Sequence, residues 1–392
     1  MSERALTVVI APSGFKESLS AEEVADAIAE GVRAADPRVR IIRVPLVDGG
    51  EGFTRALINA TDGVIKHRTV TGPVGQPVES HFGILGGDGP KTAVIEMAAA
   101  AGLRLVPRDK RNPLLTTTYG VGELIRAALD EGVERILIGC GDSGTSDGGA
   151  GMAQALGARL LRTDGSEIGR GCGALALLEK IDLSGLDPRL KRVKIDVACN
   201  IHNVLTGANG VARVFGPQKG ATPGMVEQME MALMRYARII WRDLRICVKR
   251  MPGGGASGGL GAGLHALLGA TLHPRYEIVM QYLELDRHLR EADLVITAEG
   301  GLDFQTPRGK IPAEVAARAR RYGVPVIAVA GTVGQDARVN YEHGIAAYTS
   351  VLQRPCTLDE AFQRAYEWVA MSSENIMRMI GVGWMMRAVA RA

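Results

Sequence analysis

The chain has 392 residues, of which 46% are hydrophobic and 23% are charged, and its formal net charge is +3. This composition is ordinary for a soluble globular protein with a substantial core, and the length predicts two or more domains. Because the net charge is small, we expect neither a nucleic-acid partner nor a membrane partner.

The five cysteines are scattered along the chain without C-x-x-C spacing. This pattern argues against a disulfide framework and against a zinc site, and it is typical of a reducing compartment. The first residues lead into a short apolar run and lack the long apolar region of a signal peptide. We therefore expect a cytoplasmic protein.

Glycine is the residue type that stands out, with 50 residues, about twice the usual share. The glycines cluster beside apolar runs, at 48–52, 139–151, 207–220, 252–263 and 299–301. The backbone turns tightly or approaches an anion closely at such places. The clusters are therefore candidate parts of a binding site.

Both ends of the chain alternate between short apolar runs and amphipathic helical patterns. The N-terminal pattern predicts a strand at 6–12, a helix at 20–35 and a strand at 39–48. Ser20 is the expected N-cap of that helix, with Glu23 at its third position. The C-terminal pattern predicts, before a long terminal helix, the elements 292–300 (strand), 313–323 (helix), 324–331 (strand) and 345–352 (strand).

The middle of the chain has a different pattern. Residues 67–85 predict an antiparallel hairpin, and strands are expected at 92–98, 135–141 and 194–200. We therefore predict an α/β protein in which a Rossmann-like doubly wound parallel sheet domain is built from both chain ends. The expected limits are 1–79 and 291–392 for this domain and 80–290 for a second, mixed α/β domain inserted into it. We expect the active site in the cleft between the two domains, a common place for a small-molecule site.

Residues 139–144, Gly-Cys-Gly-Asp-Ser-Gly, match the dinucleotide-binding pattern G-x-G-x-x-G. In a dinucleotide fold this pattern normally belongs to the first βα unit, whereas here it falls in the inserted domain. Asp142 and Asp147 would also repel a pyrophosphate unless a metal ion or a lysine intervened, and the glycines continue to Gly151. The stretch therefore favours an anion or metal–phosphate loop over an NAD site.

Two polar stretches follow the predicted N-terminal strands. Lys16 and Ser18 precede a helix N-terminus, which favours anions, although a solvated lysine with capping serines would explain them equally well. Asp48 and Glu51 follow the second strand at its carboxyl end, where doubly wound sheets bind ligands. These carboxylates could hold Mg²⁺ or a hydroxylated substrate, or they could cap a turn.

Two further stretches lie in the predicted inserted domain. Asn200, His202 and Asn203 follow a strand, and a turn at Gly216-Pro217 could present Lys219. Residues 252–259, Pro-Gly-Gly-Gly-Ala-Ser-Gly-Gly, resemble a phosphate-cradling nest, with a flexible hinge as the alternative. The chain has no G-x-x-x-x-G-K-[ST] pattern, which excludes a P-loop kinase.

The strongest single candidate is the stretch that follows the predicted strand 292–300. Glu299, Asp303, Gln305 and Lys310 lie within twelve residues of one another there. Phosphoryl transfer requires a cation to neutralise phosphate oxygens and a carboxylate to position the attacking hydroxyl. This stretch provides both kinds of group.

Taken in order, these blocks resemble the type I glycerate kinase family (glycerate 2-kinases). The matching blocks are APSGFKESLSAEE, PLVDGGEGF, VIEMAAAAGL, NPLLTTTYGVGELIRAAL, GDSGTSDGGAGMAQALG, VFGPQKGAT, GGGASGGLGAGL and ADLVITAEGGLDFQT, spread over about residues 5–335. The resemblance implies ATP-dependent phosphorylation of D-glycerate at the 2-hydroxyl, with Mg²⁺. It also implies a two-domain α/β kinase unrelated to P-loop or actin-like kinases.

The family pattern carries over to a set of polar positions: Lys16, Ser18, Asp48, Glu51, Ser143, Asp147, Lys219, Glu299, Asp303 and Gln305. Elsewhere the sequence departs from it. Asn200 and His202 stand where carboxylates are usual, and Gly301 stands where an arginine is usual. Asp142 and Ser146 replace a frequent glycine and a frequent asparagine.

From the residues and the resemblance together we predict direct in-line transfer, with ATP and Mg²⁺ as cofactors. We assign catalysis to Asp303, Asp48 and Lys16, with Asp303 preferred as the base. The predicted ATP-binding residues are Gly254, Gly255, Ser257, Gly258, Lys219 and Ser143. The predicted substrate-binding residues are Ser18, Glu51, Asn203, Glu299, Gln305 and Lys310, and the predicted metal ligands are Asp147 and Asp48.

Three alternatives stay open at this point. The first is a kinase of the same fold that acts on another small hydroxy acid. The second is an NAD-dependent oxidoreductase, and the third is a non-catalytic ligand-binding relative. The oligomeric state is also open, with a homodimer as one possible assembly.

Overall fold

The computed structural model describes residues 5–15 and 18–389. Lys16, one of the three residues predicted to be catalytic, lies outside the described residues. By its internal contacts the chain divides into two units, Met1–Val47 with Val279–Ala392, and Asp48–Ile278. Each unit has a sheet of its own, so the two are described separately.

The first unit is built on a five-stranded sheet in the order β13-β12-β11-β1-β2, and all of its strands are parallel. The strands are β1 (Thr7–Ile10), β2 (Arg40–Arg43), β11 (Leu294–Leu302), β12 (Val326–Val333) and β13 (Ala347–Ser350). From β1 the chain continues to β2 at one edge of the sheet, whereas from β11 it continues through β12 to β13 at the other edge. The switch point of the sheet therefore lies between β1 and β11. In open α/β sheets, ligands bind beyond the carboxyl ends of the strands at such a switch point.

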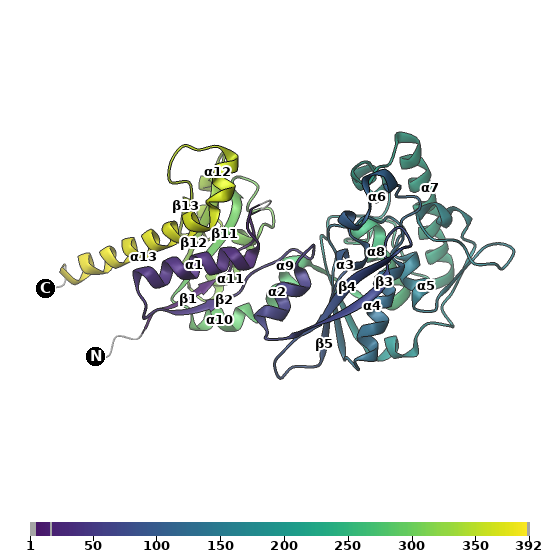
Figure 1. The fold of residues 1–392 in the computed structure, drawn as a ribbon, viewed down its shortest axis with the longest axis horizontal. Coiled ribbons are helices and arrows are strands. Elements are labelled where there is room, and N and C mark those ends of the chain that lie inside the picture. The colour runs from purple at the N-terminus through teal and green to yellow at the C-terminus, as the bar shows by residue number, and fades with distance from the viewer. Residues whose placement is uncertain (1–4, 16–17, 390–392) are drawn as a thin grey trace. The chain divides into compact units, whose positions relative to one another are not determined.

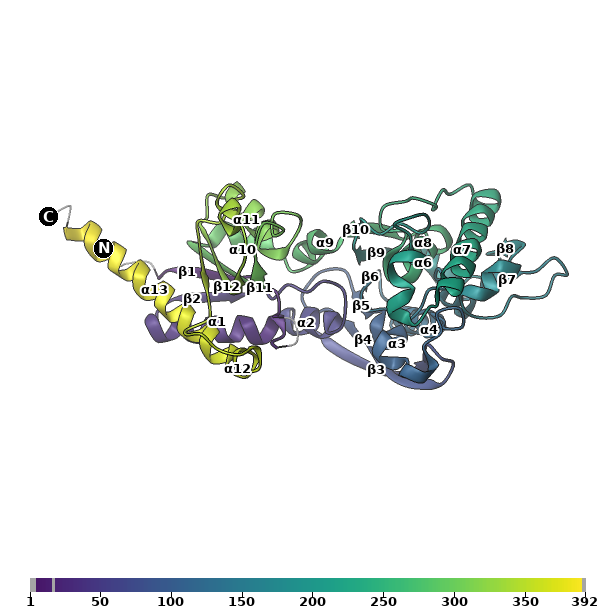
Figure 2. The same cartoon turned by 90° about the horizontal axis from the view of Figure 1, so that it is seen from above.

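Helices α1 and α13 pack against one another in the first unit (Figures 1 and 2). Ser20 and Glu23 form the expected capping box of α1. The two helices approach closely at Gly31, where a Cβ atom would lie 2.0 Å from the carbonyl oxygen of Ala370. The helices of this unit are α1 (Ala21–Ala35), α10 (Leu285–Glu291), α11 (Ile311–Arg321), α12 (Leu358–Gln363) and α13 (Ala365–Val389), with a 3-10 turn at Ala337–Tyr341.

The second unit contains a six-stranded mixed sheet in the order β10-β9-β6-β5-β4-β3. The four strands from β10 to β5 are parallel, and β4 and β3 continue the sheet as an antiparallel hairpin. The strands are β3 (Val64–Thr71), β4 (Pro77–Ile84), β5 (Thr92–Glu96), β6 (Arg135–Gly139), β9 (Lys194–Cys199) and β10 (Thr271–Pro274). A separate two-stranded sheet pairs β7 (Arg159–Leu161) with β8 (Lys180–Asp182).

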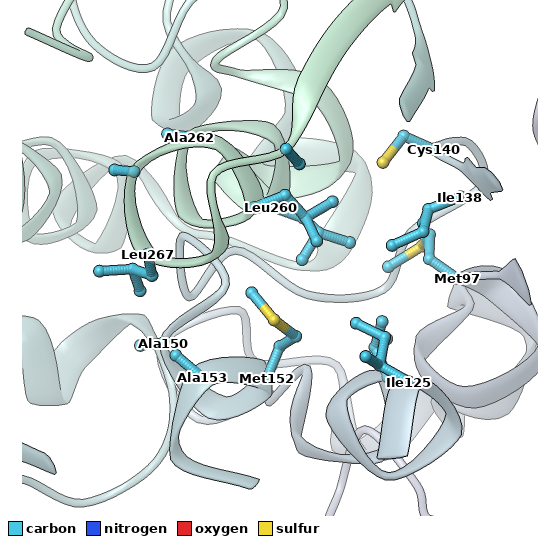
Figure 3. Packing of buried hydrophobic residues seen from close by; sticks show 14 of the residues in the cluster. Met97, Ile125, Ile138, Cys140, Ala150, Met152, Ala153, Leu260, Ala262 and Leu267 are labelled. Carbon is cyan, nitrogen blue, oxygen red and sulfur yellow. The ribbon is translucent and has the colours of Figure 1, made fainter. Parts of the chain in front are cut away.

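A large hydrophobic core lies beside this mixed sheet. Figure 3 shows Leu260 of the glycine-rich helix α8 close to Met152 of α5, and both are fully buried. A Cβ atom at Gly263 would lie 2.3 Å from the carbonyl oxygen of Gly148, so the small residues of α8 allow close packing. The helices are α2 (Phe53–Ala60), α3 (Ala98–Ala101), α4 (Tyr119–Asp130), α5 (Ala150–Ala155), α6 (Val211–Phe215), α7 (Pro223–Leu244) and α8 (Ala256–Leu268), with α9 (Arg275–Tyr282) at the unit boundary.

The structure confirms the predicted fold class but divides the chain at different residues. The units separate after residues 47 and 278, whereas the sequence pattern suggested limits after 79 and 290. The predicted hairpin explains the first difference, because β4 pairs with β5 and therefore extends the sheet of the second unit. Among the described residues, no helix is both long enough and apolar enough to cross a membrane.

Candidate active site

In the first unit, three of the four polar residues predicted in the stretch 299–310 come together at the end of β11 and in the loop after it. The Nζ atom of Lys310 lies 3.6 Å from Oδ1 of Asp303 and 3.8 Å from Oε2 of Glu299. The same ammonium group donates a hydrogen bond of 3.1 Å to the carbonyl oxygen of Gly301. A cation therefore lies between two carboxylates at the carboxyl end of β11, beside the switch point of the sheet.

The loop that holds Asp303 is well fixed by hydrogen bonds. Its carboxylate oxygen Oδ1 accepts from the backbone N–H of Gln305 at 2.8 Å, and its own N–H donates to the Oγ1 atom of Thr306 at 3.1 Å. The buried Asn340 donates to its carbonyl oxygen at 3.1 Å. Gln305 contributes its backbone to this loop, and its side chain is exposed. Asp303 is thus held at a set position while staying only partly buried.

The segment after β1 lies at the same edge of this sheet. Ser13 donates to the carbonyl oxygen of Ala298 on β11 through both its N–H (2.8 Å) and its hydroxyl (3.0 Å). Ser18 hydrogen bonds through Oγ to the carbonyl oxygen of Phe362 at 3.4 Å. The structure therefore gives Ser18 a partner within the protein, and its predicted role toward a substrate stays a prediction.

In the second unit, charged groups gather where the four parallel strands end. The loop 48–52 packs directly on this edge, because a Cβ atom at Gly141 would lie 2.6 Å from the Cα atom of Gly50. The carboxylates of Asp48 and Asp142 both lie beside Gly50, 3.2 Å and 2.2 Å from the position of its missing Cβ. A larger residue at position 50 would displace the Asp142 carboxylate.

Two arginines at this edge, which the sequence analysis did not single out, lie close to the predicted carboxylates. Arg275, which follows β10, places Nη1 at 3.5 Å from Oδ2 of Asp48. The Nε atom of Arg104 lies 3.2 Å from Oε1 of Glu51. Each predicted carboxylate therefore has a cationic neighbour. Arg275 follows a short strand and Arg104 lies in a 3-10 turn after α3. An arginine at such a place is a weak signal by itself, which is why the sequence did not reveal either one.

Glu96 is a further charged group that the sequence analysis missed. It ends strand β5, is 1% exposed, and accepts a hydrogen bond from the N–H of Thr54 at 3.3 Å. Burial raises the pKa of Glu96 to about 7, while the backbone N–H of Thr54 and the Arg104 guanidinium oppose this rise. The signal was present in the sequence as an acid directly after an apolar run, the same pattern that marks Asp48.

We expect the Glu96→Gln variant to change the pH dependence of stability. In the folded protein Glu96 keeps its proton to a higher pH than its ordinary value of 4.5. The wild type therefore loses stability as the pH rises from about 4.5 to 7, and the variant lacks this loss. Between pH 5 and 8, urea titrations should show the variant gaining on the order of 2 kcal/mol relative to the wild type. A parallel pH dependence for both proteins would contradict the assignment.

Asp147 is not placed to bind a metal ion, contrary to the prediction. It is fully buried, and its carboxylate accepts hydrogen bonds from the backbone N–H groups of Thr118 (2.8 Å), Gly149 (3.2 Å) and Gly151 (3.2 Å). The hydroxyl of Thr118 donates to it as well, at 3.0 Å. Burial raises the pKa of Asp147 and these donors oppose that rise. The carboxylate joins the loop 144–151 to the start of α4.

Lys219 and Ser143, both predicted to bind ATP, hydrogen bond to one another in the structure. The Nζ atom of Lys219 donates to Oγ of Ser143 at 2.9 Å and to the carbonyl oxygen of Thr145 at 2.6 Å. Lys219 is only 2% exposed, and burial lowers its pKa to about 7 while the charge of Asp147 opposes this. In this structure the lysine thus holds the loop that carries Ser143.

The glycine-rich stretch 253–259 packs against protein backbone. A Cβ atom at Gly255 would lie 2.1 Å from the carbonyl oxygen of Val204, and one at Gly258 would lie 1.9 Å from that of Thr145. Gly254 is buried too, and the N–H of Gly255 donates to the carbonyl oxygen of Asn203 at 3.0 Å. Contacts within the protein are therefore sufficient to require glycine here, so the glycines do not by themselves indicate a phosphate.

Ser257 is the exception in this stretch. It has a left-handed backbone conformation, with φ of 49° and ψ of 49°, which is uncommon for a residue other than glycine. Its buried hydroxyl oxygen has no hydrogen-bond partner among the described residues, and the same holds for the hydroxyls of Thr145 and Ser146. Backbone strain and unsatisfied polar groups are found at functional sites, so Ser257 stays a candidate.

The G-x-G-x-x-G glycines have a similar explanation. A Cβ atom at Gly139 would lie 2.5 Å from the ring of Phe53, and one at Gly144 would lie 2.9 Å from the carbonyl oxygen of Gly102. Helix α5 begins only at Ala150, ten residues or more after β6 ends at Gly139. In a dinucleotide site the helix follows the strand directly. The geometry agrees with the interpretation that this is not an NAD site.

Comparisons with known proteins identify the family. The model of the glycerate kinase family matches residues 8–381. The chain belongs to the glycerate kinase family. It is accordingly a kinase, as the sequence blocks indicated.

Individual relatives match over nearly their full length. The chain is 51% identical over 378 residues to the glycerate 2-kinase of Escherichia coli strain K12, which covers 96% of this chain and 99% of the relative. It is 49% identical over 375 residues to the glycerate kinase of Bacillus subtilis strain 168, covering 96% and 98%. The crystal structure of a putative glycerate kinase 2 from Salmonella typhimurium LT2 superposes with a TM-score of 0.87 at 49% identity, covering 97% of this chain and all of that one.

Proposed function

We propose that this kinase phosphorylates D-glycerate at its 2-hydroxyl group, with ATP as the phosphoryl donor. The observation that carries the proposal is the glycerate kinase family match over residues 8–381. The geometry supports it, because each unit gathers carboxylates and cations at the carboxyl ends of its parallel strands. These are the groups that position a hydroxyl and neutralise phosphate oxygens.

The proposed transfer is direct. The 2-hydroxyl oxygen of glycerate attacks the γ-phosphorus of ATP, the bond from that phosphorus to the β,γ-bridging oxygen breaks, and ADP leaves with the electron pair. The hydroxyl proton passes to the carboxylate of Asp303. Lys310, between Asp303 and Glu299, supplies positive charge for the anionic substrate, and Glu299 accepts a hydrogen bond from one of its hydroxyl groups.

The loop 48–52 fits the magnesium ion that the family implies. Mg²⁺ is usually held by one or two carboxylates together with substrate phosphates. Asp48 and Asp142 offer such a pair around Gly50, and Asp48 is half exposed. The described residues contain no cluster of three or more metal-ligating side chains. When bound there, Mg²⁺ would neutralise charge on the phosphate oxygens.

Two arginines and a buried lysine of the second unit take supporting roles in this proposal. Arg104 and Arg275 balance the carboxylates of Glu51 and Asp48. Lys219 positions Ser143 through its ammonium group. These three interactions would keep the loops at this edge in place while the anionic substrates bind.

The test is product analysis of the purified protein with ATP, Mg²⁺ and D-glycerate. We expect ADP and 2-phosphoglycerate, which ³¹P NMR distinguishes from 3-phosphoglycerate, and we expect EDTA to abolish turnover. Formation of 3-phosphoglycerate would move the attack to the other hydroxyl. A folded protein that forms no phosphoglycerate would contradict the proposal.

A second candidate is the phosphorylation of another small hydroxy acid. It is favoured by Gly301 on β11, which stands where the family usually has an arginine. The missing side chain leaves the position open, because a Cβ atom there would meet only Oγ1 of Thr332, at 3.6 Å. A panel of hydroxy acids distinguishes the two candidates by their kcat/KM values.

A further inference from the structure

A groove on the second unit contains none of the residues assigned so far. It has a volume of about 580 Å³ and lies between one face of helix α7 and the segment 247–249 (helix α7 is labelled in Figure 1). Sites for small molecules typically measure about 300–1,000 Å³. The groove is therefore large enough for one small ligand.

The groove offers an exposed aromatic and apolar surface. Trp241 is 52% exposed, and Met231 and Met234 on the same helix are 64% and 45% exposed. The residues at 231, 234, 238 and 241 follow helical spacing, so they share one face of α7. The opposite face is in the core, where Tyr236 donates a hydrogen bond to the carbonyl oxygen of Gly148 at 3.1 Å. The exposed face is thus fixed in position by a well-packed helix.

The charged residues that line the groove are all basic. Its lining includes three basic residues and no acidic residue. Arg235 is already engaged, since it donates to the carbonyl oxygen of Leu178 and pairs with Glu179 at 2.8 Å. Arg238 and Lys249 make no side-chain hydrogen bond or ion pair with any other residue in the described part of the chain. The unpaired charges would attract an anion.

We propose that this groove binds a nucleotide, with its base stacked on Trp241 and its α-phosphate near Arg238 and Lys249, so that the β- and γ-phosphates extend toward the residues that follow β9. A planar aromatic anion complements both the exposed aromatic surface and the positive charge of the groove. Bases stack on aromatic rings, and phosphates pair with cations. The proposal rests on the proposed function in one respect, namely that the nucleotide is the phosphoryl donor of the kinase.

The backbone connects the groove to the edge of the sheet. The carbonyl oxygen of Lys249 accepts hydrogen bonds from the N–H and the hydroxyl of Thr206. A few residues later, Gly253 donates to the carbonyl oxygen of Ile201, and Gly255 to that of Asn203. The segment that lines the groove therefore runs beside the residues that follow β9, at the carboxyl edge where the proposed site of the second unit lies.

Cys247 provides a direct test on the unmodified protein. It lies in the groove and is exposed, whereas Cys140, Cys172 and Cys199 are buried. Alkylation with iodoacetamide is followed by mass spectrometry of peptides, with and without ATP, and Cys356 serves as the internal control. We expect saturating ATP to slow the alkylation of Cys247 about fivefold or more, since such sites cover most of their ligand, and to leave Cys356 unaffected. Unchanged alkylation of Cys247 at saturating ATP would overturn the proposal.

Variants test the same inference through the dissociation constant of ATP. We expect Trp241→Leu to raise it about tenfold, because stacking is lost, and Arg238→Gln to raise it by a smaller factor. Trp384→Leu is the matched control, since Trp384 is 51% exposed and lies on α13 in the other unit. If Trp241→Leu binds ATP as the wild type does, the groove is not the nucleotide site.

The outcomes separate this proposal from the proposed function. Protection of Cys247 by ATP without formation of phosphoglycerate would support the groove and contradict the reaction. Formation of phosphoglycerate without protection would support the reaction and overturn the groove. A wild type that does not bind ATP at all would contradict both.

Discussion

The Asp303→Asn variant is expected to lose about a thousandfold in kcat while it keeps its fold. Loss of a positioned general base typically costs factors of about 10² to 10⁴. The asparagine oxygen can still accept the hydrogen bond that Gln305 donates to the aspartate, so the loop should stay in place. What the variant cannot do is accept the proton of the attacking hydroxyl. Steady-state kinetics with glycerate, together with circular dichroism, measure both properties.

Two further variants make this result interpretable. Asp303→Ala should be at least as inactive, because it also removes a carboxylate 3.6 Å from the Lys310 ammonium. Asp359→Asn changes an exposed acid in the first turn of α12 of the same unit and should leave kcat unchanged. Near-normal kcat in the Asp303 variants would remove this residue from the mechanism and leave Asp48 as the preferred base.

The Asp147→Asn variant is expected to be strongly destabilised, by on the order of 4 kcal/mol. The aspartate is fully buried among backbone N–H donors and the hydroxyl of Thr118. The asparagine amide has one oxygen in place of two, and its NH₂ group would face N–H and O–H donors. At least one of these buried donors would therefore lose its hydrogen-bond acceptor. Equilibrium unfolding in urea measures the loss.

The control for this prediction is Asp164→Asn. Asp164 also accepts hydrogen bonds, from the N–H and hydroxyl of Ser166, but it is exposed on a turn. We expect the Asp164→Asn variant to show only a small change in the free energy of unfolding. If Asp147 were a metal ligand instead, Mg²⁺ would stabilise the wild type more than the Asp147→Asn variant. Equal effects of Mg²⁺ on both proteins would agree with the structural role.

Much of the prediction was possible because it depended on residues that are close together in the sequence. The capping box of Ser20 and Glu23 was readable because it depends on residues three positions apart. The gathering of Glu299, Asp303 and Lys310 was also readable, because twelve residues that follow a strand cannot move far from its end. Recognition of the glycerate kinase family came from eight ordered blocks and was confirmed by the comparisons.

The places where the prediction differed from the structure involve contacts between distant segments. The predicted limit after residue 79 cut through the hairpin of β3 and β4, because nothing local shows that β4 pairs with β5. Arg104 was missed for the same reason, since its proximity to Glu51 depends on how loop 48–52 packs. Glu96 had a local signal, but its contact with Thr54 is a contact between distant segments.

The sequence by itself determined the fold class, the family and where glycine clusters beside apolar runs. The tertiary structure alone decided what each glycine approaches and which charged side chains are enclosed. Gly258 and Gly255 face backbone carbonyl oxygens, and Asp147 and Lys219 are buried within the protein. The physical reason is that a glycine leaves room either for a ligand or for another part of the chain. A charged side chain can likewise bind a ligand or another residue of the protein. Only the three-dimensional neighbours distinguish the two.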